Sequence, residues 1–235
     1  MSHIVSLLTS QDIFTDSSVQ QHPLGTKSET NDGRVYRYCK AGTTALAVGK
    51  LQQNAAQDAN FNLLSVADAA IGAVELTVTL NGTAVTASLF KEGFVIIDGG
   101  TGAGQCYKIQ SHSVQTSTTG ALTVKLEDPV VTALVSATVC LKRNPYDAVI
   151  VAPVTPTGAI VGIAVYPITA SYFGWVQVGG IAPALSDATE WAVGDMVGFS
   201  LTEGAAMTAA LIDGKIGNAL GTGASGTYRP IMLSI

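Results

Sequence analysis

Charged side chains are scarce in this chain of 235 residues. Lysine and arginine together number 12, aspartate and glutamate 17, and the charged share of 12% is about half that of an average globular protein. Hydrophobic residues make up 47% of the sequence, and the mean hydropathy is +0.36. These charged residues are too few to cover the surface of an isolated monomer. Permanent interfaces between subunits, in contrast, resemble a protein core in composition. We therefore expect a subunit whose surface is partly buried in an assembly.

The sequence also lacks a basic stripe and a long apolar run. The nearest basic groups, in residues 34–40 and 142–143, are short, and the net charge is −5. A surface that binds phosphates needs clustered lysine and arginine, so we expect no nucleic-acid partner. The most apolar region, residues 148–170, contains three prolines and two glycines, so no run reaches the roughly 18 apolar residues of a membrane-spanning helix. We expect no membrane partner.

Cysteine is rare, with three residues, and no pair of them has the spacing of a metal site. Cys39, Cys106 and Cys140 are far apart in the sequence, which predicts buried structural thiols rather than a zinc site or a disulfide framework. The first residues lack the basic segment, the longer apolar core and the cleavage site of a signal peptide. We therefore expect the chain to fold in a reducing cytoplasm.

Histidine is equally rare, and this argues against hydrolytic chemistry. A serine or cysteine nucleophile needs a histidine base and an orienting acid. His3 and His22 fall in the polar start of the chain, and His112 lies in a turn that Cys106 could approach, with no third group to complete a triad. Most carboxylates stand beside turn residues, so the acid pair of a glycosidase is not indicated. We expect a protein without enzymatic activity, cofactor or metal.

The most conspicuous glycine cluster is Gly99-Gly-Thr-Gly-Ala-Gly104. A phosphate-binding loop requires a helix directly after its glycines, because the amides and the helix dipole must converge on the anion. Here the next residues are typical of a strand. The cluster therefore predicts a glycine-rich hairpin turn.

Local patterns predict an all-β fold. Residues 12–33 are polar, rich in turn residues and without period, which predicts an extended arm. Val74–Leu80 alternates apolar and polar residues, and the Asn81-Gly82 that follows is typical of a hairpin turn. Similar short segments recur to the end of the chain, as in barrels and sandwiches. Residues 55–70 carry the only helical pattern.

These patterns divide the chain into three parts. We predict an extended N-terminal arm with its first strand at residues 1–45 and a β domain at residues 46–144, preceded by a short helix. Asn144-Pro145 marks a boundary, after which residues 145–235 form a C-terminal β-barrel domain. The fold would thus be an arm followed by two small β-barrel or β-sandwich units. The middle domain could be an insertion.

Several short segments are distinctive. Three lie early in the chain: His22-Pro-Leu-Gly-Thr, Asp32-Gly-Arg-Val-Tyr-Arg-Tyr-Cys-Lys-Ala-Gly and Ala45-Leu-Ala-Val-Gly-Lys-Leu-Gln-Gln. Two lie later: Gly174-Trp-Val-Gln-Val-Gly-Gly and Val193-Gly-Asp195. The early segments look like the opening of the virion structural proteins of tailed bacteriophages, and the later ones are similar to the later part of such proteins. The resemblance is closest to their capsid decoration, or cement, proteins. Residues 73–144 lie outside this resemblance.

The resemblance implies a homotrimer, made in the host cytoplasm, that sits on the capsid exterior and bridges subunits of the major capsid protein. An extended polar arm suits that role because it can pair with the strand edges of a neighbour. We expect residues 1–32 to be dispensable for folding. The expected contacts with the capsid are Thr15, Asp16, His22, Pro23, Leu24, Gly25, Arg34, Tyr36 and Tyr38. Two alternatives are a tail or baseplate component and a glycan-binding surface module.

Overall fold

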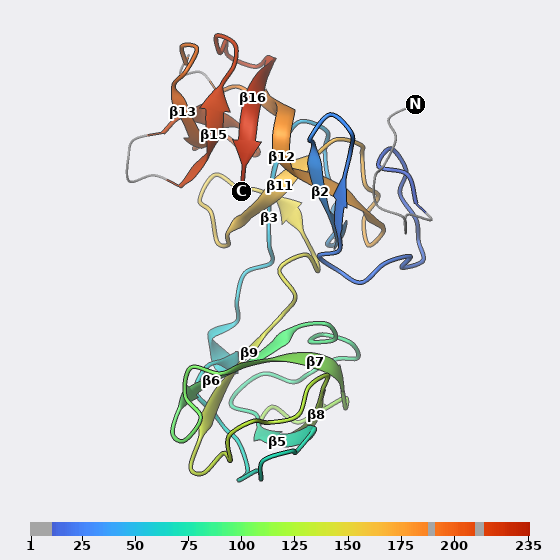
Figure 1. The fold of residues 1–235 in the computed structure, drawn as a ribbon, viewed down its shortest axis with the longest axis vertical. Helices are drawn as coiled ribbons and strands as arrows, with labels where there is room; N and C mark the ends of the chain where they lie inside the picture. Colours follow the sequence, from blue (N-terminus) through green and yellow to red (C-terminus); the bar gives the residue numbers. More distant parts are fainter. Residues whose placement is uncertain (1–10, 188–190, 210–213) are drawn as a thin grey trace. The chain divides into compact units, whose positions relative to one another are not determined.

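The predicted all-β fold is confirmed by a computed structural model, which describes residues 11–187, 191–209 and 214–235. In these ranges the one helical element is a single 3₁₀ turn, η1 (Ala59–Phe61). No described helix therefore has the length and apolar character needed to cross a bilayer. Two sheets form two separate units (Figure 1).

The first unit, here called the body, combines the described residues up to Ala56 with Pro145–Ile235. Its ten-stranded sheet curves as a half-barrel. One long strand, β12, organises this sheet, because it pairs with β2 along its first half and with β16 along its second half. The strands of the body are β1 (Lys27–Glu29), β2 (Val35–Lys40), β3 (Leu51–Gln53), β10 (Ile150–Val151), β11 (Ile160–Ala164), β12 (Phe173–Leu185), β13 (Met196–Phe199), β14 (Ala206–Thr208), β15 (Lys215–Ala219) and β16 (Tyr228–Ser234).

The second unit, here called the inserted barrel, is Gln57–Asn144. Its six strands follow the order β4-β9-β6-β7-β8-β5, and a bridge between Val66 and Val78 brings the two ends of the sheet together. The sheet is thereby nearly closed, which leaves little free edge. The strands are β4 (Leu64–Ser65), β5 (Glu75–Thr79), β6 (Phe94–Gly99), β7 (Cys106–His112), β8 (Ala121–Leu126) and β9 (Thr138–Lys142).

The division into units differs from the one expected. Residues 11–45 and 145–235 belong to one unit rather than to two parts, and the boundary expected at residue 46 lies too early. The physical reason is strand pairing across the insertion. β2 pairs with β12, and β3 pairs with β10 and β11, so the segments before and after the barrel share one sheet.

Two local predictions are also wrong. The helical pattern of residues 55–70 gives η1 and the two-residue strand β4, because Asp58 accepts a hydrogen bond from the Asn60 amide and fixes a tight turn. Asn81-Gly82 does turn the chain, with Gly82 at a φ of 108°, but it joins no hairpin. The partner of β5 is β8, much further along the chain. The glycine loop after β6 is a hairpin turn as predicted, since β6 pairs with β7.

The strand faces give the barrel an apolar core of its own. In β5, β8 and β9 every second residue is buried, and these residues join one apolar cluster confined to the barrel.

We expect a fragment of residues 57–144 to fold by itself and to unfold cooperatively. Ile97→Ala should lower its free energy of unfolding by about 2–5 kcal/mol, because Ile97 is fully buried, whereas Ile71→Ala at an exposed site should change it little. Urea unfolding followed by circular dichroism measures both effects, and an unfolded fragment would contradict the assignment.

Candidate interaction surfaces

The first described residues pack against the body. Residues 11–26, here called the N-terminal segment, contain no regular strand, as expected for an arm. Ser17 and Phe173 nevertheless exchange backbone hydrogen bonds of 2.9 and 2.8 Å, which attach the segment to the start of β12. On β2, the Gly25 amide donates to the Tyr38 carbonyl at 2.8 Å, and the Tyr38 amide donates to the Thr26 carbonyl at 3.0 Å. The segment therefore pairs with strands of its own chain.

An aromatic cluster lies beneath this segment. Ile13 is 1% exposed and packs with Tyr36, Tyr38, Phe173 and Trp175 in one buried cluster. Gln11 is joined to this cluster by hydrogen bonds. Its backbone carbonyl accepts from the indole Nε1 of Trp175 at 3.2 Å. Its side-chain oxygen accepts from the Tyr38 hydroxyl at 2.7 Å, and its side-chain nitrogen donates to the Phe173 carbonyl at 3.0 Å. Each of these buried polar groups of Tyr38, Phe173 and Trp175 is thus satisfied by the segment.

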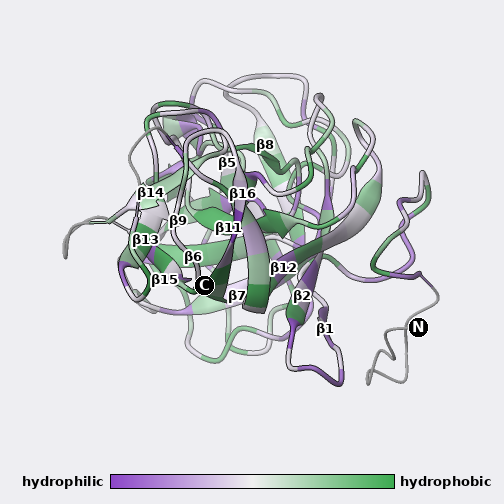
Figure 2. Ribbon diagram, turned by 90° about the horizontal axis from the view of Figure 1, so that it is seen from above, coloured by the Kyte–Doolittle hydropathy of each residue, from purple (hydrophilic) through white to green (hydrophobic). Residues whose placement is uncertain are grey.

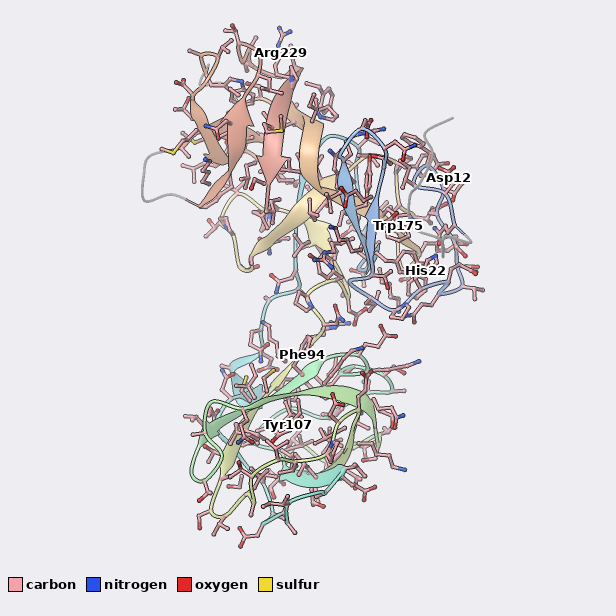
Figure 3. All side chains as sticks on the ribbon, viewed as in Figure 1. Asp12, His22, Phe94, Tyr107, Trp175 and Arg229 are labelled. Atoms are coloured by element: carbon pink, nitrogen blue, oxygen red, sulfur yellow. The ribbon has the colours of Figure 1, made fainter. Side chains whose placement is uncertain are left out.

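His22 belongs to the same cluster. Its ring centroid lies 5.1 Å from that of Tyr38 and 5.4 Å from that of Trp175, and Figure 3 shows His22 beside Trp175. The His22 side chain is almost fully buried, and its Nε2 atom has no hydrogen-bond partner. Burial without a partner disfavours the charged imidazolium, and it lowers the pKa of His22 below 6.5.

This environment predicts an acid-sensitive body. As pH falls through 6.5, the unfolded chain takes up a proton on His22 before the folded chain does, so the free energy of unfolding declines. His22→Phe keeps a ring in the cluster and removes the titrating group. We expect the loss of stability between pH 7 and pH 5 to be smaller in this variant than in the parent chain. Urea unfolding at several pH values measures the difference, and identical pH profiles would show that His22 is not the group responsible.

Three of the nine expected contact residues are unavailable to a partner. Tyr36 and Tyr38 are 0% exposed, and His22 is 8% exposed. The alternation of β2 turns both tyrosines into the core of the body, and burial raises the pKa of Tyr36 to about 12. The expectation that these three residues contact the capsid is therefore wrong.

The other six predicted residues lie at or near the surface. Thr15 and Pro23 are exposed, and Leu24 and Gly25 are half-buried. Asp16 is occupied by its own chain, because its carboxylate accepts from the Thr169 amide at 2.9 Å. Hydrogen bonds from the side chain and the backbone of Thr169 lower the pKa of Asp16. Arg34 forms a 2.8 Å ion pair with Asp32. These six residues can still contact a capsid, but they do so from a surface that is already folded on its own body.

This region is poorly suited to pair with a strand of a neighbouring protein. β1 is a three-residue strand at the edge of the sheet, and its outward side chains, Lys27 and Glu29, form a 3.1 Å ion pair. Figure 2 shows polar colouring at the turn from β1 to β2. Short charged edges disfavour the addition of another strand. The N-terminal region therefore presents side chains rather than a free backbone edge.

The cysteine and the histidine considered as a catalytic pair lie far apart. Cys106 and His112 stand at opposite ends of β7, six residues and about 20 Å apart at the rise of a strand. His112 Nε2 accepts from the Phe90 amide at 3.1 Å. Cys39 is buried as expected, and burial raises its pKa, but Cys106 is exposed and Cys140 is partly exposed. In the described part of the chain, no three His, Cys, Asp or Glu residues gather closely enough to hold a metal ion.

One apolar surface that the sequence patterns did not indicate is on the C-terminal half of the body. We call it the outer sheet face, and Figure 1 shows its strands β12, β16 and β15 side by side. Ile181 is 57% exposed, Tyr228 54%, Met232 44% and Leu220 42%. Two exposed prolines lie between them. The outer sheet face consists of Ile181, Pro183, Leu220, Tyr228, Pro230 and Met232.

The segments that carry the resemblance to virion proteins come together in the body. Tyr38 of β2 lies opposite Trp175 of β12, and His22 contacts both rings. Trp191, just before Val193-Gly-Asp195, is buried in a neighbouring cluster, and its Nε1 donates to the Gly221 carbonyl at 2.9 Å. The side chains of Tyr38, Trp175 and Trp191 thus lie in the core of the body. Comparison with protein-family models, with curated proteins and with solved structures finds no match to this chain.

Proposed function

We propose that this protein is a structural component of a phage virion that binds the outer surface of the capsid and stabilises it by bridging subunits of the major capsid protein. The proposal rests on the resemblance of its segments and on the scarcity of charge. It assigns the chain a binding role without catalysis.

The observation that carries the proposal is that both units expose large apolar side chains. On the inserted barrel, Leu63, Ile71 and Val131 are 71%, 68% and 66% exposed. On the body, Val19 is 63% exposed and Phe14 is 46% exposed. A protein that bridges two neighbours needs more than one contact surface, and many equivalent weak contacts on one shell add up through avidity.

Within the body, we assign the contact with the capsid to the outward side of the N-terminal segment. Phe14 and Val19 flank Ser17, which is fixed by its backbone bonds to Phe173. Exposed Thr15 and Pro23 belong to the same segment. Because the segment is already ordered on its own body, binding does not carry the full entropic cost of ordering a free arm.

Binding to expanded empty capsids tests this assignment. We expect the protein to sediment with the capsids at both low and high salt, because apolar contacts are screened far less than ion pairs between exposed charges. Phe14→Ser combined with Val19→Ser should weaken binding at least tenfold. Val193→Ser, at a turn before β13 with Val193 66% exposed, is the matched control and should bind as the parent does.

Two results would contradict the proposal. Failure of the parent protein to sediment with capsids would remove the capsid role. Release by moderate salt, with the serine variant unaffected, would show that charged groups form the interface.

A further inference from the structure

We propose that the outer sheet face is the surface through which copies of this chain associate with one another. The inference rests on the residue pattern of β12, β15 and β16, and it does not depend on the capsid role. It specifies both the surface and its occupant, a second copy of the chain.

The two longest strands of the body have the pattern of a sheet covered on both faces. On the inner face, Ala182 and Ala184 of β12 and Ile231 and Leu233 of β16 are buried in the core of the body. Antiparallel sheets with one face in water alternate apolar residues inside with polar residues outside. Here the outward positions between those core residues are also apolar, which is the composition of a sheet that something covers.

Register makes the outer sheet face continuous. Ile181 lies directly opposite Met232, and Pro183 lies directly opposite Pro230, so four apolar side chains form two adjacent cross-strand pairs. Tyr228, opposite Leu185, extends the face along the same two strands. From the β15 side, the Leu220 amide donates to the Pro230 carbonyl at 3.0 Å and places Leu220 beside these pairs.

The size of the face fits association between two proteins. Its six residues expose on the order of 500 Å², the size of the largest apolar patch on a typical monomer, which is often functional. Two such faces in contact bury on the order of 1,000 Å², which reaches the lower limit for a specific interface. Tyrosine and methionine, both present here, are enriched in the cores of such interfaces.

The area of the face argues for a second copy, and its lack of charge is compatible with that occupant. The chain carries a net charge of −5, so two copies repel each other over most approaches. The outer sheet face contains no charged residue, and identical copies can therefore meet there without placing like charges together. A strongly basic or acidic partner would find no complementary charge on it. Pro183 and Pro230 are rigid, which lowers the entropic cost of ordering the face.

Substitution of the paired residues tests the inference in the full chain. We expect the parent protein to be a dimer or a higher closed oligomer at micromolar concentration, as measured by analytical ultracentrifugation. Ile181→Lys combined with Met232→Lys should raise the dissociation constant at least tenfold and give monomers. Phe14→Lys combined with Val19→Lys adds the same charge to exposed apolar sites of the N-terminal segment and should leave the oligomer intact.

Circular dichroism and thermal unfolding verify that the variants remain folded. If the lysine pair prevents folding, Ile181→Ser with Met232→Ser removes the apolar contact with little perturbation, and it should also give monomers. A monomeric parent protein would overturn the inference, and so would an oligomer that persists in every folded variant of the outer sheet face. A protein that associates through this face but does not bind capsids would overturn only the proposed function.

Discussion

We expect a variant lacking residues 1–26 to unfold at a much lower urea concentration than the full chain, with a free energy of unfolding reduced by about 5 kcal/mol. The reduction has two physical sources. Ile13 is removed from a fully buried site, and the rings of Tyr38 and Trp175 lose the cover of His22. The Tyr38 hydroxyl and the Trp175 indole also lose their hydrogen bonds to Gln11. The sequence pattern alone predicts the opposite, that these residues are dispensable for folding.

Point variants separate these sources. Ile13→Ala should reduce the free energy of unfolding by about 2–5 kcal/mol, because it leaves a cavity against the aromatic cluster. Val19→Ala, on the same segment but 63% exposed, should change it by less than about 0.5 kcal/mol. Urea unfolding followed by tryptophan fluorescence reports directly on Trp175. An unchanged midpoint in the variant that lacks residues 1–26 would support a free arm after all.

The fold class and several strands were predictable because their signal is local. Alternation marked β5 from Glu75 to Thr79, and Gly99–Gly104 was identified as a hairpin turn by the strand residues on both sides. Pairing partners were not predictable in the same way. Asn81-Gly82 has the chemistry of a hairpin turn, but Asn60 donates to the Thr83 hydroxyl at 2.9 Å and holds this turn against a segment distant in sequence.

The packing of the N-terminal segment left only a weak sequence signal. Ile13 is a single buried residue in a polar stretch, so no periodicity reveals the face that it covers. The stronger signal was in β2, where Tyr36 and Tyr38 alternate with Arg37 and point to the same side of the strand. Two large side chains on one face require a covering layer, and the N-terminal segment supplies it.

The outer sheet face is difficult to predict because two consecutive glycines, Gly179 and Gly180, are typical of the end of a strand. In the structure β12 continues through these glycines to Leu185. The register with β2 shifts between Gln177 and Gly179, and Gly180 has a φ of 81°, a conformation that favours glycine. The glycines thus mark the place where β12 leaves β2 and begins to pair with β16.

The second large effect is expected on the particle rather than on the isolated protein. A subunit that binds only the assembled shell stabilises it in proportion to the logarithm of its free concentration over its dissociation constant. Each site adds a few kcal/mol by this relation, and a shell offers many equivalent sites. In the proposed role, opening the shell requires separation of the capsid subunits that the protein bridges, so its binding would also raise the barrier to rupture.

Thermal release of DNA from particles with and without the protein is the most direct test of this role. Particles that lack the protein should release their DNA at a temperature several degrees lower. Addition of the purified parent protein should restore the higher temperature at both low and high salt, and the variant with Phe14→Ser and Val19→Ser should not. Equal release temperatures with and without the bound protein would contradict the capsid-stabilising role.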